Sequence, residues 1–123
     1  MVGLIVTTEN EMSTVEYDSS HCDIIRKAVG GRYEHVRPVG LEPPYCMMVN
    51  EEGLLLNLPV NLLGSILYDA PRHGYPIVGD IIILKEGYCG GEPDLVGMTV
   101  KEAQSLGNRF SVMSGGFFRW VKV

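Results

Sequence analysis

Two hydrophobic runs joined by a turn constrain the fold of this chain more than any other feature. The runs are Tyr45 to Val49 and Leu54 to Leu56, and Asn50-Glu-Glu-Gly53 separates them. Asparagine is common in turns, and glycine accepts a positive φ at no steric cost. The pattern therefore predicts a β-hairpin as the central structural feature of the fold.

A second apolar segment is predicted to form a strand inside the sheet. Ile77 and Val78 are followed by Gly79-Asp80 and then by Ile81 to Leu84. A run this apolar is typical of a strand that is buried on both faces. Gly79 in its interior indicates a bulge or a close approach of another backbone. We therefore place this strand centrally.

The remaining patterns predict a single α+β domain over residues 1–123. In the first part of the chain, they indicate an opening hairpin over Leu4–Val6 and Ser13–Tyr17, a helix capped by Ser19 or Ser20 and ended by Gly30-Gly31, and an edge strand over Arg32–Val36. A helix capped by Asn61 is followed by a polar loop over Asp69–Pro76 and a long loop over Glu86–Gly97. The last elements are a capping-box helix from Thr99 to about Ser105 and a final strand over Phe117–Val123. These elements give a mostly antiparallel sheet of about five or six strands with two or three short helices.

Charge and cysteine content exclude several classes of protein. Fifteen acidic and ten basic side chains give a net charge of −5, which is the wrong sign for general nucleic-acid binding. The three cysteines have no CxxC spacing, so they predict neither a disulfide framework nor a zinc knuckle. The amino terminus does not have the pattern of a signal peptide, and the apolar runs are far shorter than the roughly 20 residues of a membrane span. We expect a cytoplasmic protein that does not contact membranes.

Ligand-capable side chains are densest between residues 69 and 75. Arg72 suits a carboxylate or phosphate, Tyr75 can stack on a base, and His73 lies between them. A second candidate is the glycine-rich segment around Gly90 and Gly91, whose backbone amides could approach an anion. A solvated turn and a plain loop explain the same residues. These five residues are nevertheless the predicted ligand-binding set.

No catalytic, metal or cofactor site is predicted. His21, Cys22 and Asp23 are consecutive, and consecutive residues of a helix point in different directions, so they cannot form a triad with one another. His35 and His73 are far apart in sequence, and a metal site would require both to converge with a cysteine or a carboxylate. No motif identifies such a partner, and no cofactor motif is present.

Four short motifs occur in an order that resembles a known family. They are Val29-Gly-Gly-Arg-Tyr-Glu-His-Val36, Val49-Asn-Glu-Glu-Gly53, Asn57-Leu-Pro-Val-Asn61 and Ile77-Val-Gly-Asp80. This VGGxxE, NEEG, LPxN and IxGD progression resembles a family of small domains of unknown function from phages, prophages and conjugative elements. The likeness covers about residues 4–85, and residues 86–123 follow the family pattern less. The resemblance implies a protein encoded by a mobile element and located in a bacterial cytoplasm. It assigns no active-site residue to this chain.

These observations favour a counter-defence protein that acts by stoichiometric binding. It would either inhibit a host immune protein through an acidic or aromatic patch, or sequester a nucleotide-derived immune signal between the protomers of a homo-oligomer. The rival hypothesis is a small hydrolase that acts on a signalling nucleotide, including a version with Cys22 or Cys89 as nucleophile and His35 or His73 as base. A phage accessory domain without a role in defence is the third.

Overall fold

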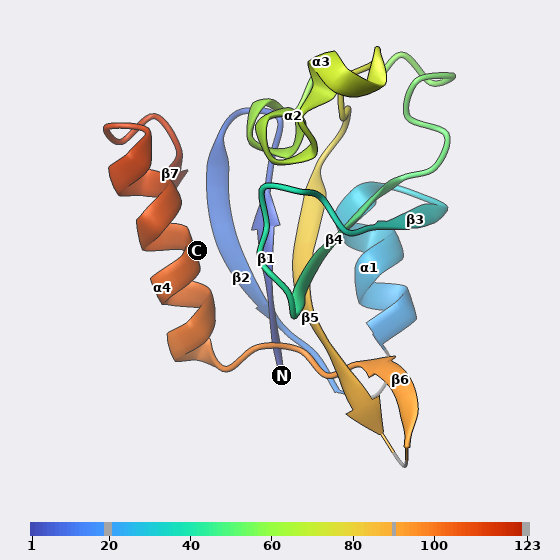
Figure 1. Cartoon of the computed structure of the whole chain (residues 1–123), viewed down its shortest axis with the longest axis vertical. Helices are drawn as coiled ribbons and strands as arrows, with labels where there is room; N and C mark the ends of the chain where they lie inside the picture. Colours follow the sequence, from blue (N-terminus) through green and yellow to red (C-terminus); the bar gives the residue numbers. More distant parts are fainter. Residues whose placement is uncertain (19–20, 90, 122–123) are drawn as a thin grey trace.

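The computed structural model describes residues 1–18, 21–89 and 91–121 (Figure 1). In chain order, the elements are β1 (Val2–Val6), β2 (Glu11–Glu16), α1 (His21–Val29), β3 (Tyr33–Val36), β4 (Tyr45–Asn50), α2 (Leu62–Tyr68), α3 (Ala70–His73), β5 (Ile81–Cys89), β6 (Glu92–Leu95), α4 (Val100–Met113) and β7 (Arg119–Trp120). The predicted α+β class is confirmed. The described residues form seven strands and four helices, slightly more of each than the sequence indicated.

One mostly antiparallel sheet organises the whole molecule. Its strand order is β3-β4-β5-β1-β2-β7, and β6 pairs with the outer part of β5. Every described pairing of strands is antiparallel except that of β2 with β7, which is parallel. The predicted opening hairpin is therefore confirmed as β1 and β2, and β3 is the edge strand that its alternating sequence indicated.

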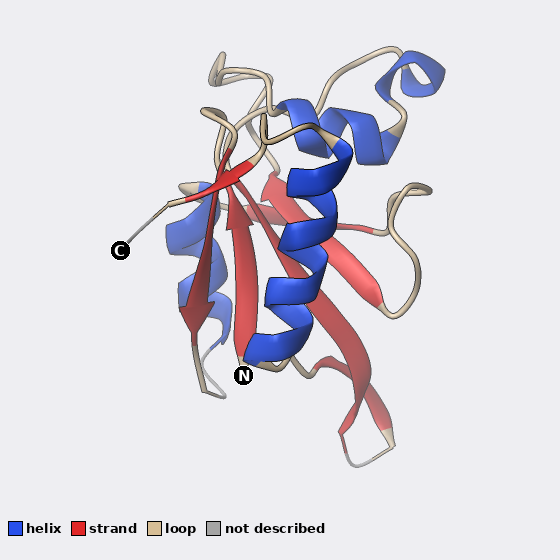
Figure 2. Cartoon of the chain, turned by 90° about the vertical axis from the view of Figure 1, so that its left-hand side faces the viewer, coloured by secondary structure: helices blue, strands red, loops and turns tan. Residues whose placement is uncertain are grey.

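Helices cover both faces of the sheet, which explains why its central strand is so apolar. Ile81 and Ile83 of β5 belong to the core beneath α4 and α2, whereas Ile82 and Leu84 belong to the core beneath α1. All four side chains are fully buried. Figure 2 shows α4 in front of the sheet and α1 behind it. The central placement of this strand is confirmed, but β5 begins at Ile81, so Ile77 and Val78 are not part of it as predicted.

The predicted hairpin around residues 50–53 is wrong. Leu54–Leu56 forms no strand, and its three side chains are 54%, 87% and 57% exposed. The two edges of β4 are already occupied by β3 and β5, so no edge remains for a following strand. The chain instead forms successive turns, with the Gly53 amide donating to the Asn50 carbonyl and the Leu56 amide to the Glu52 carbonyl.

The predicted long loop over Glu86–Gly97 is also wrong. Strand β5 continues to Cys89, and β6 returns antiparallel to it with Glu86 opposite Leu95. Gly91 at the turn has φ of 85°, a conformation that glycine adopts readily. Gly87 and Gly91 therefore belong to a hairpin that extends beyond the main sheet.

Helix α4 is longer, and the final strand shorter, than predicted. The helix runs from Val100 to Met113 because Leu106 and Phe110 continue the buried face that begins at Ala103. Of the described residues in the predicted final strand, only Arg119 and Trp120 are in β7, which pairs with β2 of the same chain, and Lys122 and Val123 lie outside the described residues. None of the helices in the described part of the chain has the length and apolar character needed to span a bilayer.

A capping box fixes the start of α4 and ties it to the sheet. The Thr99 hydroxyl accepts a hydrogen bond from the Glu102 amide, and the Glu102 carboxylate accepts one from the Thr99 amide. The same carboxylate accepts hydrogen bonds from Lys85 Nζ and from the Tyr45 hydroxyl, each at 3.0 Å. The bond from Lys85 and that from the Thr99 amide lower the pKa of Glu102 to about 2. This capping box is confirmed as the sequence predicted it.

We expect Glu102→Gln to lower the free energy of unfolding by about 1 kcal/mol at neutral pH. The pKa of Glu102 is lowered by folding from an ordinary value of about 4.3, so its charge stabilises the fold above that pH. That stabilisation is lost as the pH falls towards about 2. Urea denaturation of both proteins at several pH values should show the difference between them shrinking on acidification. A difference that stays constant with pH would contradict this role.

Candidate functional site

Three of the predicted ligand-binding residues lie together at one end of the molecule. Arg72 and His73 belong to the short helix α3, which occupies part of the predicted loop, and Tyr75 follows it. The Tyr68 ring stacks on His73, with 3.9 Å between ring centroids. The Tyr68 and Tyr75 hydroxyls are hydrogen-bonded at 2.7 Å. Arg72 Nε is 3.7 Å from a carboxylate oxygen of Asp69.

The two glycines of the predicted set belong to a different region. Gly91 lies at the turn between β5 and β6, and Gly90 lies outside the described residues. Figure 1 shows this hairpin at the bottom of the molecule and α3 at the top. Within one chain, Gly91 and Arg72 therefore do not line one pocket. A shared nucleotide site would have to form between two copies of the chain.

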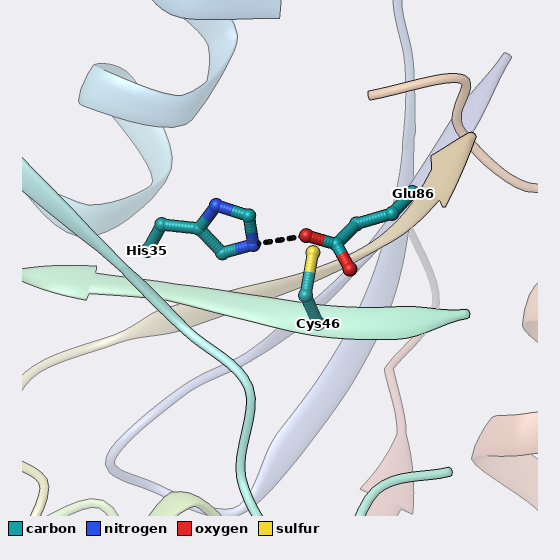
Figure 3. A group of neighbouring side chains, drawn as sticks. All are labelled: His35, Cys46 and Glu86. Carbon is teal, nitrogen blue, oxygen red and sulfur yellow. Dashed lines mark ion pairs between the residues drawn. The ribbon is translucent and has the colours of Figure 1, made fainter. Parts of the chain in front are cut away.

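Three adjacent strands bring His35, Cys46 and Glu86 together (Figure 3). Cys46 pairs with Leu84, and Glu86 is two residues further along β5, on the same face. His35 pairs with Met48, which is two residues from Cys46 and also shares its face. One donor atom from each of the three residues lies within 4.8 Å of the others.

An ion-pair network surrounds the Glu86 carboxylate. His35 Nε2 is 2.7 Å from Glu86 Oε1. Arg37 contacts both oxygens, with Nη2 at 2.7 Å from Oε1 and Nε at 3.0 Å from Oε2. The imidazole and the guanidinium group therefore hold the carboxylate in one orientation above Cys46.

Cys46 is a poor candidate for a nucleophile. Its side chain is fully buried, and burial raises the pKa of the thiol to about 12. A thiol that stays protonated at neutral pH reacts slowly, because the thiolate is the nucleophile.

The two cysteines that the sequence suggested as nucleophiles are Cys22 and Cys89. Cys22 accepts a hydrogen bond from the Tyr33 hydroxyl at 3.3 Å. Cys89 lies in β5, and its side chain is outside the described part of the structure.

A groove lies between α2 and α4, which we call the α2–α4 groove. Its volume is about 810 Å³. Its apolar rim includes Ile66, Val112 and Met113, which are 52%, 82% and 61% exposed. Lys101 and Arg109 also line it, and neither forms an ion pair with any described residue. The groove thus combines exposed apolar side chains with two cations in an acidic protein.

Sequence reasoning missed both the groove and the His35–Cys46–Glu86 cluster. The groove was missed because the predicted helix ends near Ser105, before the residues of α4 that line much of the groove. The four-residue spacing of Leu106 and Phe110 is a signal that could have extended the predicted helix. The cluster depends on the order of β3, β4 and β5. That order joins residues distant in sequence, and no local pattern encodes it. A metal site was expected to require both His35 and His73, but among the described residues only His35 meets a cysteine and a carboxylate, and His73 instead stacks on Tyr68.

A sheet covered by helices on both faces, with a groove along α4, defines a small α+β protein. The chain belongs to the family described as domain of unknown function DUF3846, which matches residues 1–111. The match includes His35, Cys46 and Glu86 and most of α4. No curated protein and no solved structure matches the chain.

Proposed function

We propose that this chain is a binding protein that acts by stoichiometric association, with the α2–α4 groove as its contact surface. The observation that carries the proposal is the row of exposed apolar side chains at the rim of that groove. In keeping with the likeness of the sequence to proteins of phages and mobile elements, the proposed partner is a host defence protein. The proposed role is counter-defence in a bacterial cytoplasm.

The exposed side chains of the groove are of the kind that protein partners bury. Burying a side chain the size of Ile66, Val112 or Met113 contributes about 1.5–3 kcal/mol when burial is complete. Grouped apolar exposure with a polar rim marks interaction sites on soluble proteins. These three side chains lie on two neighbouring helices around one hollow.

The two cations of the groove define the chemistry of the partner. Lys101 and Arg109 are two turns apart on α4 and lie beside the apolar rim. A segment that matches this surface presents apolar side chains along one stripe and acidic side chains along its flank. An amphipathic helix with acidic residues fits this description, and helix-in-groove binding is a recurring mode of recognition.

Sequestration of a nucleotide-derived signal is the second candidate. The aromatic group of Tyr68, His73 and Tyr75, with Arg72 nearby, is the observation that favours it. Since Gly91 lies at the other end of the chain, this candidate depends on a homo-oligomer. A nucleotide adduct on such an oligomer in native mass spectrometry would support it.

We expect a photo-crosslinking amino acid at Val112 to capture one host protein at a ratio of one to one. Val112 is 82% exposed and lies on the groove. The matched control carries the same amino acid at Asp23, an exposed position of α1 on the opposite side of the sheet. Crosslinking in phage-infected host cells, followed by mass spectrometry of the adduct, identifies the partner.

The control and a plating assay make this test decisive. Equal crosslinking at Val112 and Asp23, or none at Val112, would contradict docking at the groove. If the captured protein is a defence factor, expression of the chain should raise phage plating on hosts that carry it. Ile66→Asp combined with Val112→Asp should abolish that effect, because two charges would face an apolar partner surface.

A further inference from the structure

We propose that His35, Cys46 and Glu86 form a binding site for a divalent transition metal ion, with Zn²⁺ as the preferred occupant. Imidazole nitrogen, thiolate sulfur and carboxylate oxygen are the three ligand types of zinc sites in proteins. Their donor atoms already lie within 4.8 Å of one another. Mg²⁺ and Ca²⁺ prefer sets made only of oxygen ligands, so the cysteine and histidine favour a softer ion.

The spacing of the three donors is close to that of a tetrahedral site. Metal–ligand distances of about 2.0–2.3 Å place neighbouring donors of a tetrahedron about 3.3–3.8 Å apart. The His35 Nε2 to Glu86 Oε1 distance of 2.7 Å is shorter because these atoms are hydrogen-bonded. On binding, the metal ion takes the place of the proton shared by these two atoms, and it displaces the proton of the Cys46 thiol to solvent. Small side-chain rotations complete the geometry, since the His35 and Glu86 side chains are 34% and 24% exposed.

The surroundings of the cluster resemble the supporting shell of a metal site. Cys46 is fixed in the core under α1. Arg37 keeps the Glu86 carboxylate oriented through both oxygens, with Nε at 3.0 Å from Oε2 and Nη2 at 2.7 Å from Oε1. The metal ion would bind Oε1 on the side that now faces His35 Nε2. A pocket of about 580 Å³ is lined by His35, Arg37, Glu86 and Tyr88. The fourth coordination position can therefore take water or a ligand from solvent.

The competing explanation is an ordinary ion-pair network that lies above a buried cysteine. Such a network needs only His35, Arg37 and Glu86, and Cys46 would take no part in it. The two explanations differ in whether the sulfur atom bonds to the metal ion. This difference can be measured directly, because thiolate coordination to Co²⁺ produces a near-ultraviolet charge-transfer band that nitrogen and oxygen ligands do not produce.

The test is a titration of the reduced full-length protein with Co²⁺ without oxygen. We expect the charge-transfer band to saturate at one Co²⁺ per chain, and Zn²⁺ to remove it by displacement. Cys46→Ser should lose the band, and Cys22→Ser, the matched control, should keep it. His35→Gln should weaken Co²⁺ binding at least about tenfold. This variant changes a partly exposed edge-strand residue, so it decides the test if Cys46→Ser does not fold.

Several results would overturn the proposal. They are the absence of a charge-transfer band at saturating Co²⁺, its persistence in Cys46→Ser, and its loss in Cys22→Ser. Unchanged Co²⁺ affinity in His35→Gln would also overturn it. As an independent readout, Zn²⁺ should raise the melting temperature of the wild-type protein by more than that of His35→Gln, because a ligand stabilises the folded state according to its affinity.

Discussion

Replacing Phe118 with alanine should lower the free energy of unfolding by about 3–5 kcal/mol. Phe118 is 1% exposed and belongs to the same core as Phe110 of α4. Truncation of its ring loses apolar burial and leaves a cavity beside that helix. Urea denaturation, followed by circular dichroism and by the fluorescence of the single tryptophan, Trp120, measures the loss.

The neighbouring residue Phe117 provides a matched control. Its side chain is 52% exposed, and it contacts Phe118 edge-on, with 5.6 Å between ring centroids. Phe117→Ala should therefore cost only about 1 kcal/mol, the range of one aromatic pair. If Phe118→Ala does not fold, Phe118→Leu provides a milder change in the same direction. Equal losses at positions 117 and 118 would contradict the burial described.

Asn61→Ala should lower the free energy of unfolding by about 3 kcal/mol. The Asn61 side chain is fully buried and serves three partners. Its carbonyl oxygen accepts a hydrogen bond from the Gly64 amide at the start of α2, and its amide group donates to the Val6 and Gly79 carbonyls. Loss of a helix cap costs about 1 kcal/mol, and each buried carbonyl left without a partner costs at least about as much.

Asn108→Ala is the control for this substitution. Asn108 also makes a side-chain hydrogen bond, in which its oxygen accepts from Trp120 Nε1 at 2.7 Å, but that bond is exposed to solvent. Its removal should cost less than about 1.5 kcal/mol, because water replaces the lost partner. Denaturation curves in urea compare the two variants. A smaller loss for Asn61→Ala than for Asn108→Ala would show that the buried bonds do not hold α2 against the sheet.

Local signals in the sequence predicted the elements whose structure is decided locally. Asn61 caps α2 and Thr99 with Glu102 forms a capping box, as their positions before apolar helical residues indicated. The run from Ile81 to Leu84 is buried on both faces, as its composition required. In each case, the residues that determine the element lie within one or two turns of it.

Features that depend on distant segments could not be predicted in this way. Leu54–Leu56 has the composition of a strand, but β3 and β5 occupy both edges of β4. The mixed sequence of Phe117–Val123 does not reveal its buried side, which depends on packing against α4. Likewise, His35, Cys46 and Glu86 meet only through the order of three strands.

Native mass spectrometry of the chain recovered from phage-infected host cells tests stoichiometric binding most directly. The wild-type chain should carry one copy of a single host protein, and the chain with Ile66→Asp and Val112→Asp should not. A nucleotide-sized adduct on an oligomer would instead favour sequestration of a signal. A bare wild-type chain, or a complex that the double variant retains, would contradict binding through the α2–α4 groove.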